Sequence, residues 1–490
     1  MPSIHPPTER FEVSNPAIRK SKEWIPDIAP VIQGKSSLLK LIREYHTDNP
    51  GIPEEELERV FQNLTGIVQR QVGLIELDAH LDIQTVTEIF IRINSKGVVL
   101  SQADFAMSKI AANESHGGNQ LRKAIDYFCH LAVAPQFFST IQKNDAAFST
   151  TDYFKQMSWL KDENDDLYDP SYSDMLRVAF TLQFSRGRLD ELVALLSGRN
   201  FETQQYEAEI EEASYKRLKV GVEQFMNKTN FECFVMIVKS AGFIDPRLVR
   251  AQNPLNFAYI LYLKLRQEKY NPAEIGSYVR RWFVLSLLTG RYSSSPESQF
   301  DQDIRQISSR PFGEYISLIE QAELSDAFWT AGLVQALATS SSTHPTFSTY
   351  LAAQVKTGDL GFLSSDIQVQ QLLLHHGDIH HVFPRAYLKA QGLKRGDYNQ
   401  VANYVFMQTE INISIGKKSP AEYLQNILAQ CSTKIPKLGG IVDEKLLRAN
   451  LLANAIPLEL LDNPKLTYAK FLAARRTLMA AKIRKYYEGL

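Results

Sequence analysis

The strongest constraint on the fold is a helical spacing of apolar residues that persists from about residue 105 to residue 340. Apolar side chains recur at helical intervals over Met175–Phe184, Leu255–Leu265 and Tyr278–Leu288, and few runs alternate between apolar and polar residues as strands do. A stripe with this period lets each helix bury one side against its neighbours. The sequence therefore predicts a helical domain over residues 105–340.

Local capping signals predict where several helices begin. Such signals occur at Ser101–Asp104, Asn271–Glu274 and Ser419–Glu422. In each, a Ser or Asn can accept a hydrogen bond from a free backbone N–H, and an acidic residue follows in the first turn, where it favours the positive helix end. The second and third also have Pro at the first helical position, where its missing N–H costs nothing.

The loop-forming segments of the sequence predict three domains, at residues 1–104, 105–340 and 341–490. The Ser- and Thr-rich segment Thr339–Thr343 marks the second boundary. The opening, from residue 1 to about residue 27, is rich in Pro and polar residues and is expected to be an arm or an irregular strand without a core of its own. A helix is expected over Glu54–Gln69 and a short strand over Val72–Leu77, followed by an amphipathic segment over Thr85–Ile93.

Composition narrows the class of protein. Cys129, Cys233 and Cys431 lie far apart with no CxxC pair, which argues against a disulfide framework and a zinc knuckle. The sequence lacks a secretory signal at its start and any run of about 18 apolar residues, so we expect a soluble, cytoplasmic protein with no membrane partner. The net charge is only −1, but residues 375–490 hold 17 Lys and Arg against 9 Asp and Glu, a local charge of +8.

That basic segment begins with a dense histidine cluster. Residues 375–381 read His-His-Gly-Asp-Ile-His-His and hold four of the chain's ten histidines, a density typical of metal or proton chemistry. Strands are predicted over Ile379–Phe383 and Asn403–Met407, then a polar segment over Thr409–Ile415. Adjacent residues of a strand face opposite sides, so His380 and His381 should have different roles unless the strand bends. For His375 and His376 two alternatives stay open: they support the metal ligands or face DNA, or they form a solvated helix end, which is the favoured expectation.

The order of these residues resembles a known nuclease motif. His380-His381-Val382-Phe383-Pro384, then Asn403, Asn412 and Lys417-Lys418, resemble the His-Me finger (HNH) motif. In particular they resemble the C-terminal nuclease domain of GmrSD-type restriction endonucleases, the type IV enzymes that attack modified DNA. The resemblance implies a mainly α protein, with a helical middle domain and a small α+β C-terminal domain built on a ββα-metal nuclease core.

The resemblance also implies roles for individual residues. His381 would be the general base that activates water, His380 and Asn412 would hold one Mg²⁺ or Mn²⁺ ion, and Asn403 would brace the catalytic loop. Many HNH enzymes have Asp where this chain has His380, so Asp378 is an alternative metal ligand. The basic residues that follow the motif would contact phosphates; they include Arg385, Lys389, Lys417 and Lys418.

A second resemblance lies near the N-terminus. The segment from Glu88 to Ser101 contains Phe90, Arg92, Asn94 and Gly97 in a Phe-x-Arg-x-Asn-x-x-Gly pattern, similar to the ParB-like N-terminal domain of the same family. Arg92 could hold a phosphate while Asn94 and Gly97 shape the turn; alternatively, Arg92 pairs with a carboxylate and Gly97 only ends a helix. The family's upstream Asp-Gly-Gln-Gln-Arg motif is absent, so we expect a partial domain that does not use a nucleotide.

These patterns together predict a metal-dependent DNA endonuclease that restricts foreign or modified DNA. Two alternatives remain open: a catalytically silent DNA-binding or regulatory module of a defence system, and an RNase. For its partners two alternatives stay open: a homodimer, or a partner chain that supplies the missing N-terminal half. The tail from Tyr468 to Leu490 is expected to be either a phosphate-binding helix or an amphipathic helix that closes the core.

Overall fold

The computed structural model describes residues 2–68, 70–71, 76–78, 89, 100–162, 167–375, 377 and 379–490. The chain divides into two compact units, Met1–Asp82 and Ile83–Leu490, and each has its own hydrophobic core. The described residues are mainly helical, as expected, and they hold two antiparallel sheets of two strands each. The division into three domains at residues 104 and 340 stays a prediction.

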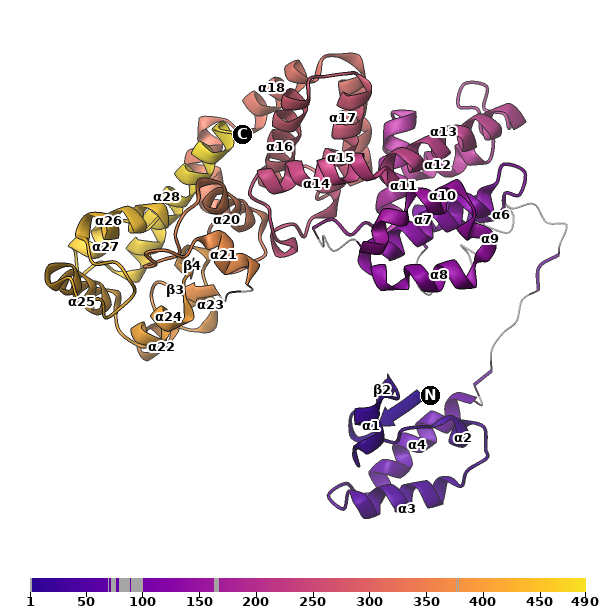
Figure 1. The fold of residues 1–490 in the computed structure, drawn as a ribbon, viewed down its shortest axis with the longest axis horizontal. Helices are drawn as coiled ribbons and strands as arrows, with labels where there is room; N and C mark the ends of the chain where they lie inside the picture. The colour runs from indigo at the N-terminus through magenta and orange to yellow at the C-terminus, as the bar shows by residue number, and fades with distance from the viewer. Residues whose placement is uncertain are drawn as a thin grey trace. The chain divides into compact units, whose positions relative to one another are not determined.

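The first unit is a β-hairpin packed with short helices (Figure 1). Its elements are β1 (Pro2–His5), β2 (Arg10–Val13), α1 (Pro16–Lys20), α2 (Ala29–Ile32), α3 (Leu38–Asp48) and α4 (Glu54–Val68). The expectation of an opening arm without a core is wrong, because Ile4 is only 1% exposed and belongs to one cluster with Ile25 and Phe61. The hairpin and a bridge between Ile4 and Ile25 hold this strand in place, and neither pairing can be read from local composition.

Helices fill the first part of the second unit. They are α6 (Gln102–Ala112), α7 (Gly118–Val133), α8 (Phe138–Asn144), α9 (Ala146–Ser149), α10 (Asp152–Gln156), α11 (Tyr172–Phe184), α12 (Leu189–Leu196), α13 (Ala208–Met226), α14 (Lys228–Ser240), α15 (Gln252–Gln267), α16 (Pro272–Thr289), α17 (Pro296–Ser309), α18 (Phe312–Glu323) and α19 (Leu333–Ala336). The three segments with the clearest helical spacing lie within α11, α15 and α16. The expected helical region is therefore confirmed.

The capping signals also act as expected. The Ser101 hydroxyl oxygen accepts a hydrogen bond from the backbone N–H of Asp104, and the Asp104 carboxylate accepts one from the Ser101 N–H. Asn271 caps α16 through the N–H of Ala273, with Pro272 at the first position. Ser419 caps the helix that follows it through the N–H of Glu422. Each such cap stabilises its helix by about 1 kcal/mol.

Two short strands and a set of helices form the rest of the second unit. They are α20 (Pro345–Thr357), α21 (Val369–Leu374), β3 (Ile379–His381), α22 (Arg385–Ala390), α23 (Arg395–Tyr398), β4 (Tyr404–Phe406), α24 (Thr409–Ile415), α25 (Pro420–Thr433), α26 (Glu444–Ala453), α27 (Glu459–Asp462) and α28 (Tyr468–Glu488). Strands β3 and β4 are antiparallel, with His381 opposite Tyr404. Both lie where strands are expected, but the polar segment after β4 is a helix, α24.

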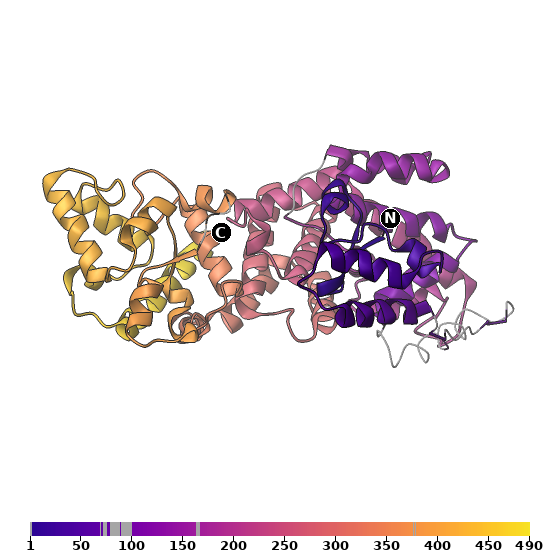
Figure 2. The same ribbon diagram turned by 90° about the horizontal axis from the view of Figure 1, so that it is seen from below.

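Helix α28 closes the core of the second unit rather than presenting a free basic face. Phe471, Met479 and Ile483 are buried on it, and it packs against α20, beside which it lies in both views (Figures 1 and 2). The Tyr486 hydroxyl donates to the Ala241 carbonyl at 2.5 Å, and Lys482 pairs with Asp359 at 2.5 Å. Of the two readings of this tail, the packing favours the core-closing helix.

The Trp282 region forms a buried polar network. The Trp282 Nε1–H donates to the Tyr292 hydroxyl at 3.0 Å, and Tyr292 in turn donates to Asp303 at 2.7 Å. Arg291 pairs with the same carboxylate at 2.5 Å, which satisfies a charge that is fully buried. This network locks α16 to α17, so these residues have a clear role in the structure itself.

The described residues also show whether any helix could cross a membrane and the state of the cysteines. None of the described helices combines the length and the apolar composition needed to cross a bilayer. All three cysteines have free thiols.

Candidate functional site

Four of the residues expected at the nuclease site line one cavity. The cavity has a volume of about 380 Å³, and its walls come from β3, the start of α22 and the end of α24. The residues that line it are Ile379, His380, His381, Pro384, Arg385, Ala386, Asn412 and Gly416. The structure therefore brings together the expected base, both expected metal ligands among the described residues and one of the expected phosphate contacts.

The local fold explains how residues 32 positions apart in the sequence reach one cavity. The chain bends at Val382 and Phe383 directly after β3, and the adjacent His380 and His381 both line the cavity. On the other side, Ile411 and Ile415 bury one face of α24, and Asn412 lies next to that face, half-buried. The helix ends at Gly416, whose φ of 58° and ψ of −118° favour glycine.

His381 is held in an environment that favours the neutral imidazole. Burial lowers the pKa of His381 below its usual value; Arg385 and His380 lower it further, whereas a hydrogen bond with Asn399 opposes the shift. The Nε2 atom lies 3.1 Å from the Asn399 Oδ1. The ring also packs edge-on against Tyr404, with centroids 5.3 Å apart. A neutral imidazole has a nitrogen lone pair that can accept a proton.

Asn403 is fully buried and braces the loop between the strands. Its Oδ1 accepts a hydrogen bond from the Phe383 N–H at 2.8 Å, and its Nδ2 donates to the carbonyls of Phe383 at 3.1 Å and Tyr398 at 3.2 Å. These bonds tie the segment that follows β3 to the end of α23. Asn403 does not line the cavity, so its contacts suit the bracing role that the family resemblance implies.

The residues available for a metal ion form an unusual donor set. Within the described part of the chain, no cluster of three or more His, Cys, Asp and Glu side chains could hold a metal. The cavity instead offers the imidazole of His380, which is 9% exposed, and the amide of Asn412. A site with two protein ligands fits an ion that keeps water and substrate in its other positions, as Mg²⁺ often does. The imidazole also suits transition metals.

The expected phosphate contacts differ in how accessible they are. Arg385 is exposed and lines the cavity. Lys389 lies over the Tyr398 ring, 5.9 Å from its centroid. Lys417 is exposed beside Gly416, whereas the Lys418 ammonium donates to the Ser414 carbonyl at 2.7 Å and so caps α24. Arg385 and Lys417 are therefore better placed for an anionic ligand than Lys418.

Several expected residues lie outside the described part of the chain. They are Asp378, His376 and the N-terminal motif residues Arg92, Asn94 and Gly97. His375 is described; it is exposed at the end of α21, which agrees with the expected solvated helix end.

Sequence reasoning missed three residues that support the site. Asn399 contacts His381, and Gly416 forms part of the cavity wall. Arg475 of α28 is fully buried and donates to the Ala402 carbonyl at 3.0 Å, next to Asn403; burial lowers its pKa. Only Gly416 carries a local signal, since a glycine after an amphipathic turn often ends a helix. The other two contacts depend on tertiary structure.

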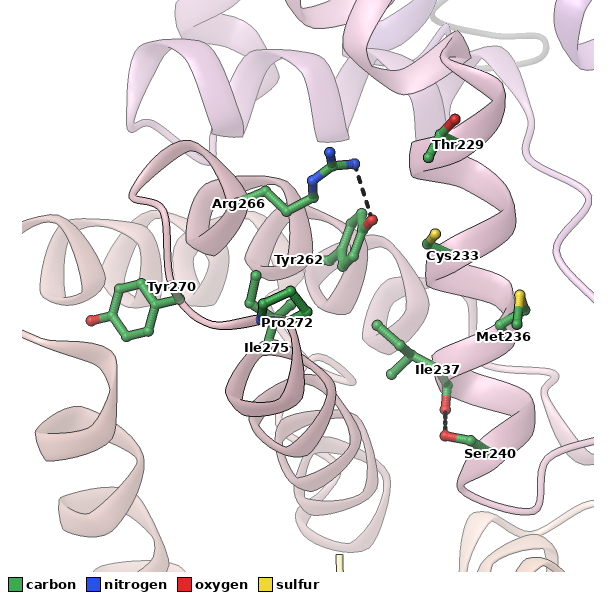
Figure 3. Close-up of a pocket in the computed structure, with 10 residues that line it drawn as sticks. All are labelled: Thr229, Cys233, Met236, Ile237, Ser240, Tyr262, Arg266, Tyr270, Pro272 and Ile275. Carbon is green, nitrogen blue, oxygen red and sulfur yellow. Dashed lines mark hydrogen bonds between the residues drawn. The ribbon is translucent and has the colours of Figure 1, made fainter.

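A second cavity, of about 550 Å³, lies in the helical part of the unit (Figure 3). One wall is a stripe of α14 that includes Cys233 and Met236, and the Arg266 guanidinium at the cavity donates to the Tyr262 hydroxyl at 3.2 Å. Its described lining contains no His, Asp or Glu. The histidine cavity, in contrast, has two imidazoles in its lining, the side chain that most often serves in general acid–base catalysis.

Comparison with known proteins adds little to the geometry. No protein-family model matches the chain, and no solved structure matches it. The chain is similar to an uncharacterized protein, MJ0686, of Methanocaldococcus jannaschii, with 22% identity over 152 residues. This alignment covers 31% of the chain and 25% of that relative, so the chain spans about a quarter of its length. A match this short and distant does not define a family.

Proposed function

We propose that this chain is a divalent-metal-dependent endonuclease that hydrolyses phosphodiester bonds in DNA and restricts foreign or modified DNA. The observation that carries the proposal is the shared cavity of His380, His381, Asn412 and Arg385. Further support comes from the chain order around it, since an antiparallel strand pair is followed directly by the helix that bears Asn412.

Each residue has a role that its environment supports. His381, kept neutral by burial, would take a proton from the attacking water. Arg385 would hold a phosphate at the cavity mouth, and Asn403 would keep the loop in shape. His380 and Asn412 would hold the metal ion, which when bound offsets negative charge on the phosphate and the leaving oxygen.

Plasmid cleavage tests this proposal. We expect the wild-type chain to nick supercoiled DNA with Mg²⁺ or Mn²⁺, and His381→Ala to lower the rate by about a hundredfold or more, because general-base catalysis contributes about that much. His375→Ala is the matched control, since that histidine is exposed at the end of α21, and it should keep full activity. Equal nicking by wild type and His381→Ala would refute the proposal.

The same assay separates the proposal from its two rivals. Cleavage of RNA without cleavage of DNA would identify an RNase. Salt-sensitive DNA binding with no cleavage under any divalent ion would identify a silent binding module. Parallel digestion of modified and unmodified DNA would then test whether modified DNA is the preferred substrate.

A further inference from the structure

The contact between His381 and Asn399 specifies which imidazole nitrogen carries the proton. The Nε2 of His381 lies 3.1 Å from the Asn399 Oδ1. An amide oxygen can only accept a hydrogen bond, so the imidazole must donate through Nε2–H. In a neutral ring the other nitrogen, Nδ1, then has no proton and keeps its lone pair.

Asn399 is itself held in place by the braced loop. It follows α23, and its backbone N–H donates to the Arg395 carbonyl at 3.1 Å. The preceding residue, Tyr398, accepts hydrogen bonds at its carbonyl from Asn403 at 3.2 Å and from the Tyr468 hydroxyl at 3.3 Å. The bonds that shape the loop therefore also hold the backbone that carries the Asn399 side chain.

The aromatic neighbours of His381 restrict its ring. Tyr404 lies edge-on to the ring at an interplanar angle of 87°, and Tyr398 lies at 67° with centroids 6.4 Å apart. Packing sets the plane of the imidazole, while Asn399 bonds to one edge of it. A base that is oriented by a third group is a recurring arrangement in nucleophile activation.

We propose that Asn399 is the positioning residue of the site, and that its amide oxygen selects the His381 tautomer with hydrogen on Nε2, leaving Nδ1 as the proton acceptor. The role of Nδ1 as proton acceptor rests on the proposed nuclease function. The tautomer itself does not, because it can be observed without any turnover.

The direct test is ¹⁵N NMR of the full chain labelled in its histidine rings, with the His381 signals assigned by their loss in His381→Gln. Above the pKa of His381 we expect the wild-type spectrum to show the Nε2–H tautomer. Asn399→Leu should give a mixture of both tautomers, and Asn399→Asp, which keeps an acceptor oxygen, should restore Nε2–H. A wild-type spectrum with the proton on Nδ1 would overturn the inference whatever the variants do.

Kinetics supply the second readout. Asn399→Leu should lower kcat by about tenfold to a hundredfold, in the range of a lost supporting contact, with little change in KM, because only the base is affected. Gln400→Leu is the matched control: this neighbouring amide bonds to Gly396 and Arg476 rather than to His381, so kcat should stay at the wild-type value.

Failure of the proposed nuclease function can be distinguished from failure of the role proposed for Asn399. A chain that shows the Nε2–H tautomer but never cleaves nucleic acid would refute the nuclease function and leave the tautomer assignment supported. A chain that cleaves DNA, while Asn399→Leu keeps both the tautomer and full kcat, would refute the role of Asn399 and leave the nuclease function intact.

Discussion

Two buried asparagines of the second unit make matching sets of hydrogen bonds, and only Asn403 bonds to the segment that follows the histidines. Asn403 bonds to the N–H and carbonyl of Phe383 and to the Tyr398 carbonyl. Asn450 of α26 accepts from the Leu363 N–H at 2.9 Å and donates to two other carbonyls. Comparing the two asparagines separates the contribution of a buried amide to the stability of the protein from its effect on the site.

We expect Asn403→Ala and Asn450→Ala each to lower the free energy of unfolding by about 2 to 4 kcal/mol, because each leaves buried backbone groups without partners. Urea unfolding measures this loss. Only Asn403→Ala should also lower the cleavage rate per folded molecule, since it frees the loop that carries Asn399. Equal loss of that rate in both variants would mean that Asn403 has no special part in shaping the site.

At His380 the identity of one side chain should determine metal preference. Imidazole favours transition metals, whereas Mg²⁺ prefers oxygen ligands. We therefore expect the wild type to bind Mn²⁺ more tightly than Mg²⁺. His380→Asp should lower the ratio of the two affinities by about tenfold, or about 1.4 kcal/mol.

Isothermal titration with each metal measures this ratio without any need for cleavage. His375→Asp introduces the same charge a few residues away on an exposed position and should leave the ratio unchanged. If both variants change the ratio of the two affinities equally, the added negative charge alone explains the change and His380 is not a ligand.

Helix α24 determines the position of Asn412. Gly416 ends this helix in a backbone conformation open to glycine but costly for other residues, and no atom lies closer than 3.6 Å to a Cβ added there. The cost of Gly416→Ala should therefore come from the backbone alone, at about 1 to 3 kcal/mol.

We expect Gly416→Ala to lower the melting temperature and to weaken Mn²⁺ binding, because the end of α24 must shift to relieve the strain. Gly396→Ala is the control: it lies in α23, has open space around it and does not have a positive φ. Wild-type metal affinity in Gly416→Ala would argue against Asn412 as a ligand positioned by this turn.

Some of these elements could be predicted from the sequence and others could not. Caps at Ser101, Asn271 and Ser419 were predictable because they depend on residues only two or three positions apart. Helix α24 was not, because its β-branched Ile and Thr residues have low helix propensity, and burial of Ile411 and Ile415 overrides it. The residues of the cavity could be proposed from a motif, but the Asn399 contact could not, because it forms only when the loop folds back.

The cap of α6 gives this element a pH dependence. Asp104 accepts hydrogen bonds from the Tyr172 hydroxyl at 2.5 Å and from the Ser101 hydroxyl and N–H at 2.7 Å. These bonds, that of Tyr172 above all, lower the pKa of Asp104 below its usual value, against the effect of burial. A carboxyl with a lower pKa in the folded state stabilises the protein above its unfolded pKa of about 3.9, and this stabilisation is lost as pH falls through the folded value.

We expect Asp104→Asn to lower the free energy of unfolding by about 1 kcal/mol near neutral pH. The difference from wild type should shrink as pH falls below about 3.9, because the wild-type carboxyl is then progressively protonated as well. Urea unfolding at a series of pH values measures it. A difference that does not change with pH would show that the negative charge of Asp104 contributes nothing.

The packing of α28 affects how many parts of the protein unfold separately. Tyr486 and Tyr487 donate to Ala241 and Glu320, at 2.5 and 2.6 Å, so the last helix is bonded to the helical region far back in the sequence. One continuous core runs through the second unit, whereas the first unit has a separate small core. Cooperative unfolding follows contiguous packing more than sequence boundaries.

We therefore expect two calorimetric transitions, a small one for residues 1–82 and a large one that includes both the helical region and the histidine site. Val284→Ala in α16 and Ile427→Ala in α25 shorten buried side chains, the first in the helical region and the second in the part that carries the histidine site. Each should cost about 1 to 4 kcal/mol and lower the same large transition, leaving the small one in place. If each variant instead moved a different transition, the second unit would consist of two independently folding domains, as a boundary near residue 340 implies.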